Sequence, residues 1–88
     1  MKVENFFKEF VIIESHLFNL AGNFDRRQGF LNLLKHLHSK NLLPKDVLTD
    51  LDLIRHIRNK VANSPHGEEE IPDEVFDRLT RIKSKLGL

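Results

Sequence analysis

The stretch Pro44–Asn63, which reads PKDVLTDLDLIRHIRNKVAN, decides the fold of this chain. At about 100° per residue, four of its apolar side chains fall within about 40° of Val47 on a helical wheel. They are Val47 itself, Leu51, Ile54 and Val61. Pro44 suits the first helical position, where its missing N–H costs nothing, and residues 64–67, SPHG, cannot continue the helix. The stretch therefore predicts one long amphipathic helix.

Three more helices are expected on either side of this stretch, because apolar residues recur there at helical spacing. The first covers about residues 3–20 and ends near Gly22-Asn23, the second covers about 25–39, and the fourth opens at Pro72 and closes at Gly87. Residues 68–70, three glutamates, are expected to form an acidic, solvated connector. Short connections between antiparallel neighbours imply an all-α, four-helix up-down bundle, with residues 1–88 in a single domain.

The size and charge of the chain limit what it can do. Eighty-eight residues suffice for one domain and bury only about 60–65% of the surface that the unfolded chain exposes, so a partner subunit would add stability. The formal net charge is +1, with 14 basic and 13 acidic residues. This balance excludes a protein held to nucleic acid by a large basic excess, although a local basic patch stays open.

Neither a metal, a cofactor nor a membrane is expected as a partner. Cysteine is absent, so thiolate metal sites are excluded. His36 and His38 stand two apart on a predicted helix, so they diverge by about 200° and cannot bind one ion together. The longest apolar run, residues 10–13, is too short to span a bilayer, and charged residues near Met1 argue against a signal peptide. We therefore expect a cytoplasmic protein.

Two charged residues fall on the apolar sides of predicted helices. Arg58 lies about 20° from Val47, and in the first helix Glu14 lies about 20° from Val3. Because a lone buried charge is far more costly than a paired one, one hypothesis is that Glu14 and Arg58 form a structural ion pair across the bundle. Two alternatives remain. Arg58 either extends along its aliphatic stem to the surface, or it faces a functional cleft.

The first predicted helix has a broad apolar side and a further apolar residue outside it. The apolar side is expected to comprise Val3, Phe6, Phe7, Phe10, Val11, Ile13, Leu17 and Phe18. Ile12 lies about 180° away from it. With seven phenylalanines in a small chain, we expect some apolar surface to be left over, and a symmetric dimer would cover it.

Residues 50–62, DLDLIRHIRNKVA, resemble the signature helix of HEPN-like domains, and mannitol-repressor-like proteins share a similar segment. The flanks are similar as well. Residues 42–46, LLPKD, resemble the family's entry into this helix, and residues 71–75, IPDEV, resemble the entry into its closing helix. The resemblance covers about residues 31–86 and implies a homodimeric helical domain.

The resemblance also implies a site. In active family members an arginine is followed, after roughly four to six residues, by a histidine that can move a proton at the ribose 2′-hydroxyl, and two such motifs meet in a homodimer as a metal-independent ribonuclease. Arg58 matches that arginine and Asn59 the polar residue after it, but Asn63 stands at the histidine position. An amide does not titrate near neutral pH. The motif is therefore degenerate.

Two residues after this helix have more than one interpretation. Asn63 is interpreted as a residue that ends the helix, where asparagine tolerates left-handed geometry, with or without a part in binding. His66 lies beyond Pro65, outside the family spacing, and is either a solvated loop residue or a substitute for the missing histidine.

Together these patterns predict a non-catalytic, HEPN-like interaction or regulatory module that forms a homodimer. Its predicted binding residues are Arg55, Arg58, Asn59 and Asn63, and its partner is expected to be RNA, a nucleotide or a protein. A second hypothesis is a toxin-like, metal-independent ribonuclease that uses Arg58 with His66 as catalytic residues. A third is a small transcriptional co-regulator similar to mannitol-repressor proteins.

Overall fold

A computed structural model describes residues 2–66 and 71–88 of the chain. Within them the secondary structure is entirely helical, which confirms the predicted all-α class. The elements are α1 (Lys2–Ala21), the 3₁₀ helix η1 (Arg26–Gln28), α2 (Phe30–Ser39), α3 (Lys45–Asn63) and α4 (Glu74–Lys85). The predicted acidic connector, residues 68–70, lies outside the described residues.

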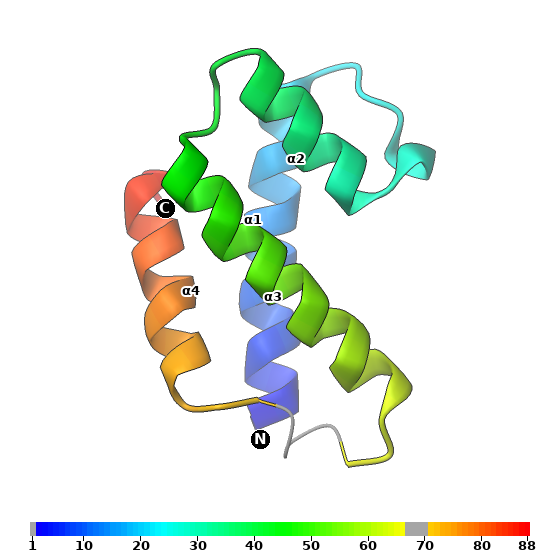
Figure 1. Cartoon of the computed structure of the whole chain (residues 1–88), viewed down its shortest axis with the longest axis vertical. Coiled ribbons are helices and arrows are strands. Elements are labelled where there is room, and N and C mark those ends of the chain that lie inside the picture. The colour runs from blue at the N-terminus through cyan, green and yellow to red at the C-terminus, as the bar shows by residue number, and fades with distance from the viewer. Residues whose placement is uncertain (1, 67–70) are drawn as a thin grey trace.

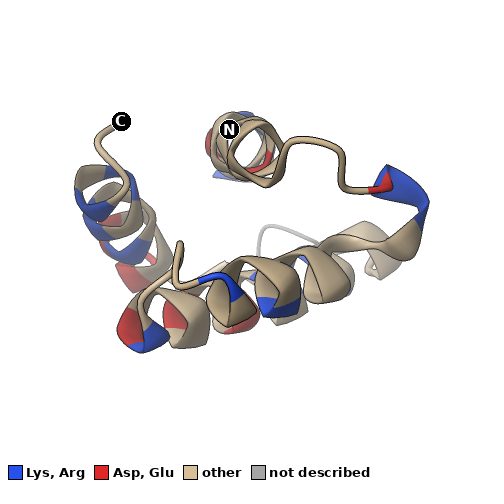
Figure 2. Cartoon of the chain, turned by 90° about the horizontal axis from the view of Figure 1, so that it is seen from above, with Lys and Arg blue, Asp and Glu red and all other residues tan. Residues whose placement is uncertain are grey.

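The four α-helices form a small bundle (Figure 1). α1 and α4 run in the same direction, α3 crosses the molecule in the opposite direction, and the short α2 covers one end. In the view from above, α2 and α3 lie together on one side, α1 lies on the opposite side, and α4 lies at the left edge between them (Figure 2). The C-terminal half of α3 therefore extends beyond α2, and this is where the predicted binding residues are.

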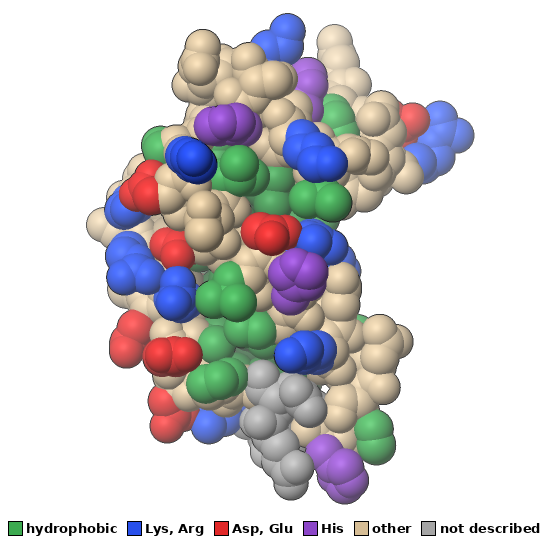
Figure 3. Space-filling view, viewed as in Figure 1, with side chains coloured by type: hydrophobic (Ala, Val, Ile, Leu, Met, Phe, Trp, Pro, Cys, Tyr) green, Lys and Arg blue, Asp and Glu red, His purple; other side chains and the backbone are tan. Residues whose placement is uncertain are grey.

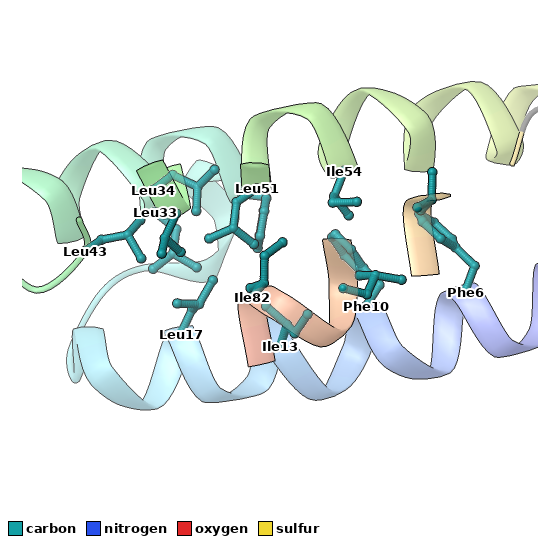
Figure 4. Packing of buried hydrophobic residues seen from close by; sticks show 14 of the residues in the cluster. Phe6, Phe10, Ile13, Leu17, Leu33, Leu34, Leu43, Leu51, Ile54 and Ile82 are labelled. Carbon is teal, nitrogen blue, oxygen red and sulfur yellow. The ribbon is translucent and has the colours of Figure 1, made fainter. Parts of the chain in front are cut away.

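The core is built from the apolar sides of all four helices. Figure 4 shows Ile13 and Leu17 of α1, Leu33 and Leu34 of α2, Leu51 and Ile54 of α3, and Ile82 of α4 packed together. Each of these side chains is buried. Burying a leucine or isoleucine stabilises a fold by about 1.5–3 kcal/mol relative to leaving it in water, so the predicted apolar stripes account for the assembly.

The second predicted helix, about residues 25–39, is in fact two elements. Asp25 Oδ1 accepts a hydrogen bond from the backbone N–H of Arg27 at 2.9 Å, which caps the 3₁₀ turn η1. Gly29 then takes φ 89°, a value that side-chain-bearing residues rarely adopt, and separates η1 from α2. The prediction of one continuous helix was wrong because periodicity does not reveal such a break.

The predicted ends of α1 and α4 agree with the structure, and so does the predicted apolar side of α1 except at one residue. α1 ends at Ala21 and α4 at Lys85, and the glycines that follow, Gly22 and Gly87, have positive φ as expected of helix ends. Ile12 is 38% exposed, as its position opposite the apolar side indicated. Val11 was placed on the apolar side but is 53% exposed, because it lies at the edge of the stripe, about 80° from Val3.

Ion pairs fix α4 to its neighbours. Lys83 Nζ lies 2.6 Å from Glu9 Oε2 of α1, and Lys85 binds Asp46 of α3. Figure 2 shows that α4 carries both basic and acidic residues along its length. No helix within residues 2–66 and 71–88 is both long and apolar enough to cross a membrane.

Candidate functional site

Arg58 points inward from α3. Its Cζ lies 5.3 Å from the centre of the Phe10 ring of α1, a cation–π distance. The side chain is half-buried, and its Nε atom is fully covered yet has no hydrogen-bond partner among the described residues. The inward direction predicted for Arg58 is confirmed, and its environment is an aromatic ring of the neighbouring helix.

The predicted ion pair between Glu14 and Arg58 is not formed. Both side chains are half-buried, but none of the ion pairs between described residues, with N···O up to 4.0 Å, joins them. The guanidinium instead lies over Phe10, one helical turn before Glu14 on α1. Because neither charge is fully removed from water, neither needs the other as a partner, and the premise of a costly lone charge does not apply.

Arg55 has a carboxylate partner that the sequence interpretation missed. Its Nη2 lies 2.9 Å and its Nε 3.2 Å from Oδ1 of Asp52, three residues earlier on α3. The Arg55 side chain is only 18% exposed. Residues three apart face each other on a helix, so this pair could have been read from the spacing. The charge of Arg55 is therefore compensated, and that of Arg58 is not compensated by any described carboxylate within 4.0 Å.

Asn59 and Asn63 are exposed on the last turns of α3. The Nδ2 atom of Asn63 donates a hydrogen bond to the backbone carbonyl of Asn59 at 2.9 Å. Asn63 is the last residue of the helix, as predicted, but it is not left-handed. Asn41, after α2, has that conformation instead, with φ 60°. The physical reason is that Ser64 leaves α3 in an extended conformation, so no left-handed residue is needed there.

The four predicted binding residues share one broad side of α3. Arg55, Arg58, Asn59 and Asn63 span an arc of about 140° around the helix axis. Arg58 lies at the edge nearest α1, whereas the two asparagines are in solvent. These four residues are called the α3 arginine face below. Figure 3 shows the surface hollowed at the right edge, between the part formed by η1 and the start of α2 and the part formed by the end of α3.

His66 is exposed in the turn that follows α3. Its backbone N–H donates to Ser64 Oγ at 3.1 Å, which stabilises the turn. Among the described residues no hydrogen bond joins His66 to Arg58.

The buried carboxylate of α3 is Asp50, which the sequence interpretation did not select. Asp50 is 9% exposed, and its Oδ1 accepts a hydrogen bond from Arg78 Nη1 of α4 at 2.8 Å. Its Oδ2 lies 3.5 Å from Arg81 Nε. The signal was present, because Asp50 stands three residues after Val47 and four before Ile54, both of which are buried.

Two shallow pockets lie outside the arginine face. One of about 390 Å³ is lined by Ala21, Asn23, Phe24, Asp25, Gln28 and His36. Another, of about 280 Å³, lies between α2 and α3 and is lined by Leu31, Lys35, Leu48, Thr49 and Asp52. Each lies beside a carboxylate that a neighbouring arginine already binds, Asp25 by Arg27 and Asp52 by Arg55.

The histidines of α2 have separate surroundings. The His36 ring packs on Phe24 with 5.0 Å between ring centres, whereas His38 Nδ1 lies 3.0 Å from the carbonyl oxygen of Leu43. Within the described part of the chain, no three His, Cys, Asp or Glu side chains come together as a metal site would require.

Two exposed carboxyls have shifted pKa values. The hydrogen bond from the Arg27 side chain lowers the pKa of Asp25 below its ordinary value of 3.8, and the hydrogen bond from Lys85 lowers that of Asp46. Both shifts belong to ion pairs that join structural elements or cap a turn, away from Arg58. The α3 arginine face therefore remains the candidate site.

Comparison with known proteins does not assign this site. The chain matches no protein-family model, no curated protein and no solved structure.

Proposed function

We propose that this protein is a non-catalytic, HEPN-like binding module that holds the phosphate groups of RNA on the α3 arginine face. The single observation that carries the proposal is Arg58, an inward-directed guanidinium held over Phe10 with no described carboxylate within 4.0 Å. Packing already restricts the conformations of this side chain. Binding of a phosphate to it therefore costs little additional conformational entropy. The partner is therefore an anion.

The form of the site favours weak, backbone-directed binding. The formal net charge is only +1, so few phosphates are neutralised at once. Tyrosine and tryptophan are absent, and Phe10 and Phe30 are buried, so neither of these phenylalanine rings is available for a base to stack on. Asn59 and Asn63 supply amide groups for hydrogen bonds to sugar or phosphate oxygens.

Among residues 2–66 and 71–88, no hydrogen bond or ion pair joins Arg58 to a histidine or a carboxylate, which supports a non-catalytic role. Asn63 occupies the position at which the HEPN-like motif has histidine, and its amide already donates to Asn59. An amide cannot act as a general base near neutral pH. His66 lies in the exposed turn beyond the helix.

We also propose that the module is a homodimer. Val11, Ile12 and Leu20 on α1 are apolar and 38–53% exposed, and burying them in a symmetric contact would remove apolar surface from water. This support is independent of Arg58.

The binding proposal is tested by titrating fluorescent single-stranded RNA with the wild-type protein and with Arg58→Met and Lys40→Met. Both variants replace a cation by an unbranched apolar side chain, and Lys40 is exposed at the end of α2, away from the arginine face. We expect Arg58→Met to weaken binding about tenfold and to reduce the salt slope by about one, and Lys40→Met to change the affinity less than about twofold. Equal losses in the two variants would exclude a localised site.

The non-catalytic part has its own test. The protein is incubated with structured and unstructured RNA in EDTA, and products are examined for 2′,3′-cyclic phosphate ends. We expect no cleavage. Cleavage that persists in EDTA and disappears in Arg58→Ala would replace this proposal by the ribonuclease hypothesis, whereas a lack of saturable RNA binding would favour a protein-binding co-regulator.

A further inference from the structure

Three residues of α3, Asp52, Arg55 and His56, contact one another and are called the Asp52 cluster below. Arg55 Nη2 lies 2.9 Å from Asp52 Oδ1 and 3.3 Å from His56 Nε2. The same His56 Nε2 lies 3.6 Å from Asp52 Oδ2. Arg55 and His56 therefore contact the same carboxylate and each other.

The contact between Arg55 and His56 requires a neutral imidazole. A guanidinium has only N–H donors and keeps its proton at all relevant pH values, so Nε2 of His56 must accept, with the ring proton on Nδ1. When the ring gains a proton at Nε2, that atom becomes a donor. The hydrogen bond from Arg55 is then lost, two cations repel each other, and Asp52 Oδ2 accepts from His56.

We propose that His56 is a proton-sensitive element that controls Arg55. When His56 is neutral, Arg55 donates hydrogen bonds to both Asp52 and His56. When His56 is protonated, Arg55 loses the hydrogen bond to His56 and shares the Asp52 carboxylate with a second cation. Resting on the proposed function, this inference assigns a regulation to the α3 arginine face. RNA binding tightens when the His56 ring gains a proton.

His56 lies close enough to the α3 arginine face for the charge of its ring to act on an anion bound there. His56 lies about 60° from Asn59 and about 20° from Asn63 around the helix axis. A proton on the ring therefore adds a positive charge directly beside the arginine face, while the weaker hold on Arg55 makes its guanidinium available to a phosphate. Both changes favour an anion.

The other charged groups around the cluster act in the same direction or lie elsewhere. Lys35 of α2 lines the pocket that Asp52 also lines, and Lys60 follows one turn after His56 on α3. On α4, Arg78 and Arg81 are bound to Asp50, which lies about 120° around α3 from His56. Asp52 is the carboxylate within 4.0 Å of the ring among the described residues, so the proton exchange is centred on it.

The device is first tested without RNA. In a pH titration followed by NMR, the Arg55 Nε–H resonance is expected to move with the same midpoint as the His56 ring protons. In His56→Gln, whose side chain is neutral at every pH, that resonance is expected to stay in place over the imidazole range. Because His56 is 59% exposed, the substitution leaves the core untouched. If the chemical shift of Arg55 Nε–H in the wild-type protein does not change while the His56 ring protons shift, the inference is overturned.

The second test measures RNA affinity at about pH 8 and about pH 5.5, within the range in which imidazoles titrate. We expect the wild-type protein to bind about threefold to tenfold more tightly at the lower pH, in line with one added cation at the site. His56→Gln should lose most of that change, and His66→Gln, the control, should keep it. An unaltered pH dependence in His56→Gln would overturn the inference. If RNA binds at neither pH, the proposed function fails, while the Arg55 resonance still reports on the cluster.

Discussion

Asp50 and Arg58 are two inward-directed charges on the same helix, eight residues apart, and the bundle treats them differently. Two arginines of α4 form ion pairs with Asp50, and one of them, Arg78, also donates a hydrogen bond to it. Arg58 meets the face of Phe10 and leaves its Nε without a hydrogen bond among the described residues. A buried charge with complete partners joins two helices. A charge that packing holds, and that no carboxylate of the described residues neutralises, remains available for a ligand. This difference separates the structural half of α3 from the candidate functional half.

The sharpest way to break this comparison is to remove the Asp50 carboxylate. Asp50→Ala would leave Arg78 and Arg81 facing each other without their anion, so we expect the free energy of unfolding to fall by about 2 kcal/mol. The loss is below that of a completely buried pair because Arg78 and Arg81 are 33% and 53% exposed and can be hydrated. Urea denaturation measures it. Asp52→Ala, at a half-exposed ion pair on the same helix, is the control and should cost less than about 1 kcal/mol. If the two variants lose the same free energy of unfolding, the Asp50 carboxylate stabilises the bundle no more than the half-exposed Asp52 carboxylate does.

Replacing Arg58 tests the opposite half of the helix. Arg58→Met keeps an unbranched apolar stem over Phe10, so we expect the free energy of unfolding to stay within about 1 kcal/mol of wild type, even though RNA affinity falls. Arg58→Ala also removes the stem and should cost about 1–2 kcal/mol. Urea denaturation of both variants is the measurement. A loss in Arg58→Met as large as that in Asp50→Ala would show that Arg58 is a structural residue, which removes the contrast.

The charge of Glu14 should matter little, since it has no cationic partner within 4.0 Å among the described residues. We expect Glu14→Gln to change the free energy of unfolding by less than about 0.5 kcal/mol. Thermal and urea unfolding measure it, with Glu9→Gln as the matched control, because Glu9 on the same helix is bound by Lys83. A larger loss in Glu14→Gln than in Glu9→Gln would restore the predicted pair with Arg58.

The smallest effect concerns Asp46, whose pKa is lowered by the hydrogen bond from Lys85. A carboxyl with a lower pKa in the folded state stabilises the protein above its ordinary pKa of 3.8, and that stabilisation disappears as the pH falls through the folded-state value. We therefore expect the stability of wild type and Asp46→Asn to differ slightly near pH 6 and to converge below about pH 4. Urea midpoints across this range check it. A difference that grows toward acid pH would contradict the assigned cause.

The sequence predicted the helices well because burial repeats with the helical period. The bounds of α1, α3 and α4 follow to within about two residues from the apolar spacing together with the prolines and glycines at the helix ends, and the inward direction of Arg58 follows from the spacing. The partner of each charge does not follow, because it depends on how the helices cross. Glu14 and Arg58 share the right faces, yet Phe10 occupies the place beside the guanidinium. The break at Gly29 was missed for a related reason, since a single backbone dihedral angle leaves no periodic trace.

One consequence of the ion pairs around α4 concerns ionic strength. Within the described residues, α4 supplies the cation in four ion pairs, with the three carboxylates of Glu9, Asp46 and Asp50. None of the described ion pairs involves α2, which is held by apolar side chains. Added salt screens partly exposed pairs but not apolar burial. The attachment of α4 therefore loosens in concentrated salt while α2 stays docked, so backbone amides of α4 exchange with deuterium sooner there than those of α2.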